Sequence, residues 1–117
     1  MATAEVIVVA PDVAFRHSLI FVLESGGFRA LSCDSLEAAF TSSQAHGVGC
    51  AVVDDEAIRS WQYAQKLFGS FACPVVLLVG HSRISPDVPF VRCLAKPFLG
   101  EPLLQAVQEV VAGKFRS

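Results

Sequence analysis

Asp54 and Lys96 have the residue types and positions best suited to chemistry, because each stands at the end of an apolar segment. Asp54 follows residues 50–53, and Lys96 follows residues 91–95 and precedes Pro97. A carboxylate can attack a phosphoryl group, and a lysine ammonium can neutralise charge on the phosphoryl oxygens. The two residues therefore predict a phosphoryl-accepting pocket, provided that both reach the same edge of one sheet.

Five apolar segments define the strands that must bring these residues together. They are residues 6–10, 28–33, 50–53, 75–79 and 91–95. Helical patterns separate them, and this β-α repeat predicts a parallel sheet with right-handed crossovers. Ligands of a doubly wound α/β sheet bind beyond the carboxyl ends of its strands. We therefore expect Asp54 and Lys96 to meet at that edge.

The first two helices carry start signals. Asp12 precedes the first, and the pair Gly26-Gly27 ends it. Asp34, with Glu37 three residues later, forms a capping pattern for the second. The apolar face expected for the first helix consists of Phe15, Leu19, Val22 and Leu23.

The later connections differ in length and composition. A third helix is expected from about residue 57 to residue 68, and a last helix has Pro102 in its first turn and Gly113 at its end. Residues 81–90 contain two prolines, which an ordinary multi-turn helix does not accommodate. The sequence therefore predicts a shortened or missing fourth helix.

The composition suits a buried sheet and argues against two kinds of partner. Of the 117 residues, 53% are hydrophobic and 17% are charged, which favours strands covered on both faces. This length fits a single domain over residues 1–117. A net charge of −2 gives no electrostatic basis for direct nucleic-acid or anionic-membrane binding, and no apolar run could span a bilayer.

The cysteines give a further indication of environment. Cys33, Cys50, Cys73 and Cys93 form no C-x-x-C pair and no cluster with histidines. We interpret them as reduced thiols of a cytosolic protein.

In these features the sequence resembles the receiver domain of bacterial two-component response regulators. The resemblance rests on Val52-Val53-Asp54, on the PVVLL segment that begins at Pro74, and on Lys96-Pro97-Phe98. It covers essentially the whole chain and implies a flavodoxin-like, five-stranded sheet in the order 2-1-3-4-5. It also implies a cytoplasmic phosphorelay module that is not an enzyme and whose partner is a sensor histidine kinase or another signalling protein.

The resemblance implies a role for each matching residue. Asp54 matches the phosphoacceptor, Lys96 the residue that stabilises the phosphoryl group, and Pro97 the family's cis-proline. Glu56 matches the position whose backbone carbonyl completes the family's Mg²⁺ shell. Asp55, like Glu56, is otherwise interpreted as a residue that favours the start of the following helix.

Several positions depart from the family pattern. Ala10 and Pro11 stand where receivers carry an acidic pair for Mg²⁺. Asp54 is then the only well-placed carboxylate ligand for the metal, so we expect Mg²⁺ binding to be weak or absent. Asp12 would have to approach the metal as a substitute ligand, whereas its residue type and position favour a helix N-cap. Val79 and Cys93 occupy the two switch positions, but Val79 has no hydroxyl group and Cys93 is too small to act as a rotating aromatic.

These departures leave a second function open, in which the chain is a phosphorylation-independent pseudo-receiver that acts as an interaction or homodimerisation module. Gly80-His81-Ser82 is similar to the nucleophile elbow of α/β hydrolases, but the second glycine is missing and no partner residues are evident. Trp61 and Tyr63 could be exposed anchors for a partner or part of the core.

Overall fold

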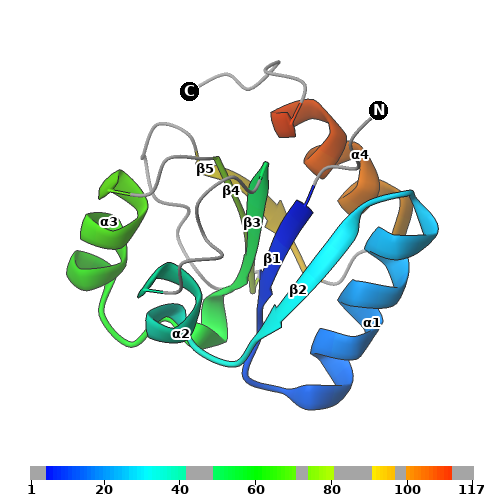
Figure 1. The fold of residues 1–117 in the computed structure, drawn as a ribbon. Coiled ribbons are helices and arrows are strands. Elements are labelled where there is room, and N and C mark those ends of the chain that lie inside the picture. The colour runs from blue at the N-terminus through cyan, green and yellow to red at the C-terminus, as the bar shows by residue number, and fades with distance from the viewer. Residues whose placement is uncertain (1–4, 42–48, 71–73, 81–90, 97–99, 112–117) are drawn as a thin grey trace.

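The computed structural model has a parallel sheet of five strands in the order β2-β1-β3-β4-β5, as the sequence predicts (Figure 1). The structure describes residues 5–41, 49–70, 74–80, 91–96 and 100–111. The strands are β1 (Glu5–Val9), β2 (Arg29–Cys33), β3 (Cys50–Asp54), β4 (Val75–Val79) and β5 (Val91–Ala95).

Helices cover both faces of this sheet, which makes the fold a doubly wound α/β sandwich (Figure 1). One face is covered by α1 (Val13–Ser25) and α4 (Gly100–Val111). The other is covered by α2 (Leu36–Thr41) and α3 (Trp61–Ser70). The arrangement confirms the parallel sheet predicted from the alternation of strands and helices and the flavodoxin-like class implied by the family resemblance.

Alternate residues of the central strands enter two separate cores. Val8 and Val52 are fully buried on the α1 and α4 face, whereas Val53 and Leu77 are fully buried on the α2 and α3 face. A strand with both faces buried has few polar positions, which explains the continuous apolar runs in the sequence. The strands consequently leave their polar groups to the residues at their ends.

The first helix begins and ends as expected. Asp12 is its N-cap, and its Oδ2 accepts the backbone N–H of Phe15 at 2.8 Å. The N–H of Gly26 bonds to the carbonyls of Val22 and Leu23, and Gly27 has a φ of 93°, a backbone conformation that favours glycine.

Two other helix starts differ from the sequence prediction. Ser35, rather than Asp34, caps α2, since the Ser35 Oγ accepts the Ala38 N–H at 3.1 Å. The third helix does not start near residue 57, because residues 55–57 form the 3-10 turn η2 (Asp55–Ala57). Ser60 accepts the Tyr63 N–H at 3.3 Å and caps α3 after that turn. In both cases a nearby serine takes the cap position.

The last helix starts at Gly100, with Pro102 in its first turn as predicted. The predicted shortening of the fourth helix falls on residues 81–90, and the predicted helix end at Gly113 falls beyond residue 111. Both lie outside the described residues.

Candidate functional site

Asp54 is the last residue of β3 and lies at the carboxyl edge of the sheet. It pairs with Leu78 of β4, and only 1% of its surface is exposed. It makes no side-chain cap for the η2 turn that follows. The carboxylate is therefore placed at the sheet edge without a helix-capping role.

Lys96 is the first residue after β5 and approaches Asp54 directly. The backbone N–H of Lys96 bonds to the Val79 carbonyl at 2.8 Å, which aligns the chain after β5 with the end of β4. Its Nζ lies 2.7 Å from Asp54 Oδ1 and 5.7 Å from the centre of the Phe15 ring. The structure thus brings together the two residues that the sequence singled out.

Asp55 is a third member of this cluster, and the sequence analysis assigned it no role in the site. Its Oδ1 accepts a hydrogen bond from Lys96 Nζ at 2.9 Å, and its Oδ2 accepts the backbone N–H of Gly80 at 2.9 Å. Only 3% of Asp55 is exposed. The available signal was the pair of consecutive aspartates after an apolar strand.

The three charges of the cluster alter one another's pKa values. Burial raises the pKa of the Asp54 carboxyl, and the hydrogen bond and charge of Lys96 offset only part of this rise. At Asp55 burial also acts upward, but the hydrogen bonds from the Gly80 N–H and from Lys96 outweigh it and lower the pKa. Burial lowers the pKa of Lys96, but its two hydrogen-bonded carboxylates reverse this effect and raise it.

The end of β1 has a different character. Ala10 is fully buried, and Pro11 is exposed. The Asp12 carboxylate is used as the α1 cap described above. From the next turn of α1, Arg16 Nη1 donates a hydrogen bond to the Ala10 carbonyl at 2.6 Å, which places a guanidinium cation at this strand end.

Comparison with known proteins identifies the family to which this arrangement belongs. The transcriptional regulator protein FixT of Rhizobium meliloti (strain 1021) is 35% identical over 108 residues, which cover 91% of each protein. The chain belongs to the response regulator receiver family. It is therefore a receiver domain of two-component signal transduction, as the sequence resemblance indicates. No family model matches the receiver.

Solved structures show the same fold at lower sequence identity. A response regulator receiver domain protein from Bacillus halodurans is 19% identical with a TM-score of 0.77, over 92% of this chain and 96% of that one. Full-length FixJ from B. japonicum is 23% identical, also with a TM-score of 0.77. The match covers 96% of the receiver but 59% of FixJ.

The carboxyl edge of this receiver does not match the needs of Mg²⁺. That ion prefers oxygen ligands in octahedral geometry and is usually held through one or two carboxylates. Asp12 is used as a helix cap, and Lys96 already lies between Asp54 and Asp55. Within the described residues no group of three or more His, Cys, Asp or Glu side chains could hold a metal. The Glu56 side chain is exposed. The assignment of its backbone carbonyl to the metal does not depend on the side chain and stays a prediction.

The two altered switch positions lie in the sheet, and Pro97 lies outside the described residues. Val79 is 4% exposed, pairs with Ala95 and belongs to the core on the α2 and α3 face. Cys93 is half-buried and packs against the same core. Neither side chain offers the hydroxyl group or the aromatic ring of the family pattern. The cis-proline assignment stays a prediction.

A polar concavity lies beside the cluster at the same edge of the sheet. It is formed by the ends of β1 and η2 and by the starts of α2 and α3, and Tyr63 on its rim is 44% exposed. Its lining residues are Pro11, Asp34, Ser35, Leu36, Glu37, Glu56, Ala57, Arg59, Ser60 and Tyr63.

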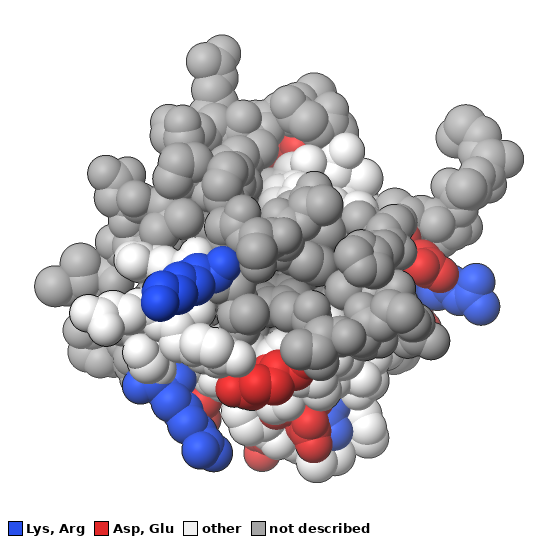
Figure 2. Space-filling model, turned by 60° about the vertical axis from the view of Figure 1, so that its left-hand side comes forward, with Lys and Arg blue, Asp and Glu red and all other residues white. Residues whose placement is uncertain are grey.

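Figure 2 shows side chains of both charge signs on the face turned to the viewer, with no continuous basic stripe among the described residues.

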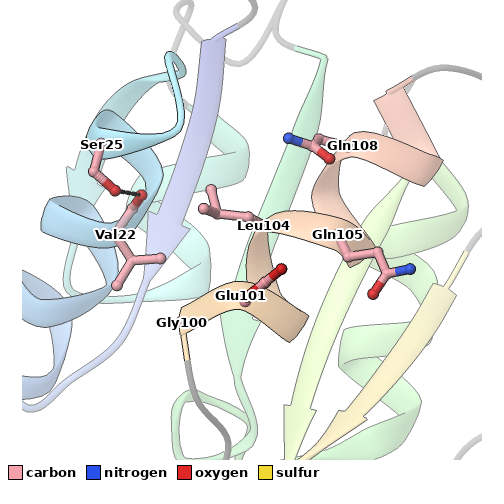
Figure 3. A pocket seen from close by; sticks show the side chains of 7 residues that line it. All are labelled: Val22, Ser25, Gly100, Glu101, Leu104, Gln105 and Gln108. Atoms are coloured by element: carbon pink, nitrogen blue, oxygen red, sulfur yellow. Dashed lines mark hydrogen bonds between the residues drawn. The ribbon is translucent and has the colours of Figure 1, made fainter.

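A second groove lies between α1 and α4 and contains none of the candidate site residues (Figure 3). It is lined by Val22, Ser25, Gly100, Glu101, Leu104, Gln105 and Gln108. A Cβ at Gly100 would lie 3.2 Å from the Val22 side chain, which would have to shift slightly to accommodate it. Among the described helices, none has the length and apolar character that a bilayer crossing needs.

Proposed function

We propose that this receiver accepts a phosphoryl group on Asp54, with Lys96 stabilising the transferred group. The observation that carries the proposal is the 2.7 Å contact between Lys96 Nζ and Asp54 Oδ1. An Asp54 oxygen would attack the phosphorus of a phosphohistidine or of acetyl phosphate. A new O–P bond forms, and the bond to the donor breaks with its electron pair leaving on imidazole or acetate.

Lys96 supplies the charge that this step requires. As the bond to the donor breaks, negative charge is spread over the phosphoryl oxygens, and a preorganised cation at the acceptor lowers the cost of that charge. The raised pKa of Lys96 keeps its ammonium protonated at neutral pH. Because the end of β1 provides no carboxylates for Mg²⁺, the proposed reaction depends on Lys96 rather than on the metal and is slow.

The partner in this proposal is a sensor histidine kinase or another phosphohistidine-bearing signalling protein. The chain then acts as a stoichiometric acceptor in the relay, not as an enzyme that turns over a substrate. We place this exchange in the cytoplasm, where thiols stay reduced. Cys33, Cys50 and Cys93, the cysteines within the described residues, are free thiols.

The second candidate is the phosphorylation-independent interaction or homodimerisation module. It is favoured by one observation: Ala10 and Pro11 occupy the two positions at the end of β1 where receivers carry acidic residues. In that case Asp54, Asp55 and Lys96 act as a structural ion cluster, and the partner is recognised without any phosphoryl transfer.

Intact-mass measurement separates the two candidates. The native protein is incubated with acetyl phosphate, with and without Mg²⁺, and we expect it to gain one phosphoryl mass slowly. Asp54→Asn should abolish the gain. Asp12→Asn is the matched control, because asparagine caps a helix about as well as aspartate and should leave the gain unchanged. A native protein that never gains the mass from acetyl phosphate or from a phosphorylated kinase would favour the second candidate.

A further inference from the structure

The groups able to hold a phosphoryl group at this site are already bonded to Asp55. Two donors of the described residues beside Asp54 are the Lys96 ammonium and the Gly80 backbone N–H. Asp55 Oδ1 accepts from the ammonium and Oδ2 accepts from the backbone N–H, each at 2.9 Å. One carboxylate therefore joins the end of β4 to the residue after β5.

An anion bound beside Asp54 would accept hydrogen bonds from the same two donors that Asp55 uses. Phosphoryl oxygens take the same kinds of donor as a carboxylate, namely an ammonium and a backbone N–H. The two oxygens of Asp55 satisfy one donor of each kind, and they do so from the residue next to the acceptor. Asp55 thus brings a negative charge to this site and makes contacts of the kind that a bound phosphoryl group would make.

The two aspartates of the cluster have little exposed surface. Asp54 and Asp55 are 1% and 3% exposed, and the Lys96 side chain is 21% exposed. The polar concavity at the same edge is lined by neither aspartate. A phosphoryl donor can reach Asp54 with its oxygens against Lys96 and Gly80 only after the Asp55 carboxylate has moved away.

The charges of the cluster also oppose the addition of a phosphoryl group beside Asp55. One ammonium now faces two carboxylates. Phosphorylation of Asp54 would exchange its single negative charge for a phosphoryl group of about −1.5 to −2 charges, beside an Asp55 whose pKa is lowered. The single lysine would then be shared between two anionic groups, and like charges at this distance oppose each other.

We propose that Asp55 is an internal competitor for the phosphoryl-binding groups, so that the resting receiver carries its own carboxylate in the place of a bound anion. The proposal rests on the proposed function for its biological meaning. Its physical content is narrower: Asp55 blocks anion binding at Lys96 and Gly80. Phosphoryl transfer to Asp54 is slow because this contact must be broken as well as because the metal ligands are missing.

The test uses inorganic phosphate as the probe and the full chain as the protein. Phosphate is titrated into native protein and into Asp55→Asn and Asp55→Ala, and binding is followed by the NMR shift of the Gly80 amide. Asp55→Asn preserves the shape of the side chain, so it protects the test if Asp55→Ala fails to fold. Asp34→Asn, which removes one negative charge from an exposed position at the same edge, is the matched control.

We expect Asp55→Asn to bind phosphate about tenfold or more tightly than Asp34→Asn and to shift the Gly80 amide on binding. The rate of mass gain from acetyl phosphate should rise in parallel. Equal phosphate affinity in the native protein and both asparagine variants would overturn the inference. Tighter phosphate binding by Asp55→Asn without any phosphorylation of Asp54 would support the competition and contradict the proposed function, so the two can fail separately.

Discussion

The carboxyl edge of the sheet has two halves with different charged groups. At the ends of β3 to β5, Asp54, Asp55 and Lys96 form a buried ion cluster in which both carboxylates bond to the same ammonium. At the end of β1, a buried alanine and an exposed proline are followed by Asp12, which is used as a helix cap. The first half holds the proposed phosphoryl-accepting residues, whereas Asp12 in the second half makes a helix-capping contact.

This difference indicates that phosphoryl binding and Mg²⁺ binding at this edge depend on different residues. In the proposed function, holding a phosphoryl group requires donors, and Lys96 and the Gly80 amide are the candidates. Holding Mg²⁺ usually requires carboxylates, whereas at the end of β1 Arg16 donates to the Ala10 carbonyl. A guanidinium beside that carbonyl repels a second cation. Substitutions in each half therefore test the two proposed tasks separately.

The largest expected effect comes from removing the cation of the buried ion cluster. Lys96→Met leaves two buried carboxylates without their common partner and should lower the free energy of unfolding by about 3–5 kcal/mol. Denaturant unfolding at neutral pH measures the loss. Lys66→Met, at an exposed position on α3, is the control and should change stability by less than about 0.5 kcal/mol. Equal stabilities of the two variants would show that the cluster contributes nothing net.

A second test restores an acid to the end of β1. Pro11 is exposed, so Pro11→Asp adds a carboxylate at the edge without disturbing the core. We expect it to tighten Mg²⁺ binding by about tenfold, or about 1.4 kcal/mol, over a weakly binding native protein. Mg²⁺ titrations followed by Trp61 fluorescence or by NMR shifts near Asp54 compare the two. If the native protein binds as tightly as the variant, Asp12 serves as a ligand and the two halves are not separate.

A smaller effect is expected for the cap itself. Asp12→Ala removes the acceptor of the Phe15 N–H and should destabilise the protein by about 1 kcal/mol. The same variant should leave Mg²⁺ binding unchanged, because the Asp12 carboxylate faces the helix. Asp34→Ala, which removes an exposed aspartate beside a serine cap, should cost less in the same thermal or denaturant unfolding. A loss of Mg²⁺ affinity in Asp12→Ala would reassign this residue to the metal.

The smallest expected effect concerns pH, where burial raises the pKa of Asp54 and Lys96 offsets only part of this rise. The folded pKa of Asp55 is below its ordinary value of 3.8, so its contribution to stability is present above pH 3.8 and is lost as the pH falls through the folded value. The folded pKa of Asp54 is above 3.8, so the folded state binds more protons there and stability falls as the pH rises through that window.

Asp54→Asn removes the second of these contributions and leaves in place the larger causes of the lowered Asp55 pKa, its hydrogen bonds from the Gly80 N–H and from Lys96. Relative to the native protein, it should become more stable as the pH rises above 3.8 and should keep the acid-side loss that belongs to Asp55. Urea unfolding across this range measures the difference. A native protein whose stability rises through the whole range, in parallel with the variant, would mean that Asp54 is not held above its ordinary pKa.

Much of the fold could be predicted from the sequence, because strands buried on both faces consist of continuous apolar residues. The apolar runs of β1, β3 and β4 predicted their strands to within one residue, and the alternation with helices predicted the parallel topology. Local capping was less predictable. Asp34 and Ser35 are both good caps, and only the path of the chain after β2 selected Ser35.

The meeting of Asp54 and Lys96 was also predictable, because parallel strands end at one edge and both residues follow strand runs. Asp55 was not. Side chains alternate along a strand, so a residue directly after Asp54 is expected on the opposite face, away from Lys96. The strand ends at Asp54, however, and the η2 turn redirects the chain so that both carboxylates reach the same ammonium.

The sequence by itself determined the order of the elements, their burial and the residues available at the carboxyl edge. Only the tertiary structure decided which of those residues share a partner. The shared partner depends on the backbone N–H of Gly80 and on the turn after β3. Neither of these can be recognised from the residue types. A backbone amide is present in almost every residue, so its use as an anion donor is set by where the chain folds rather than by what the chain contains.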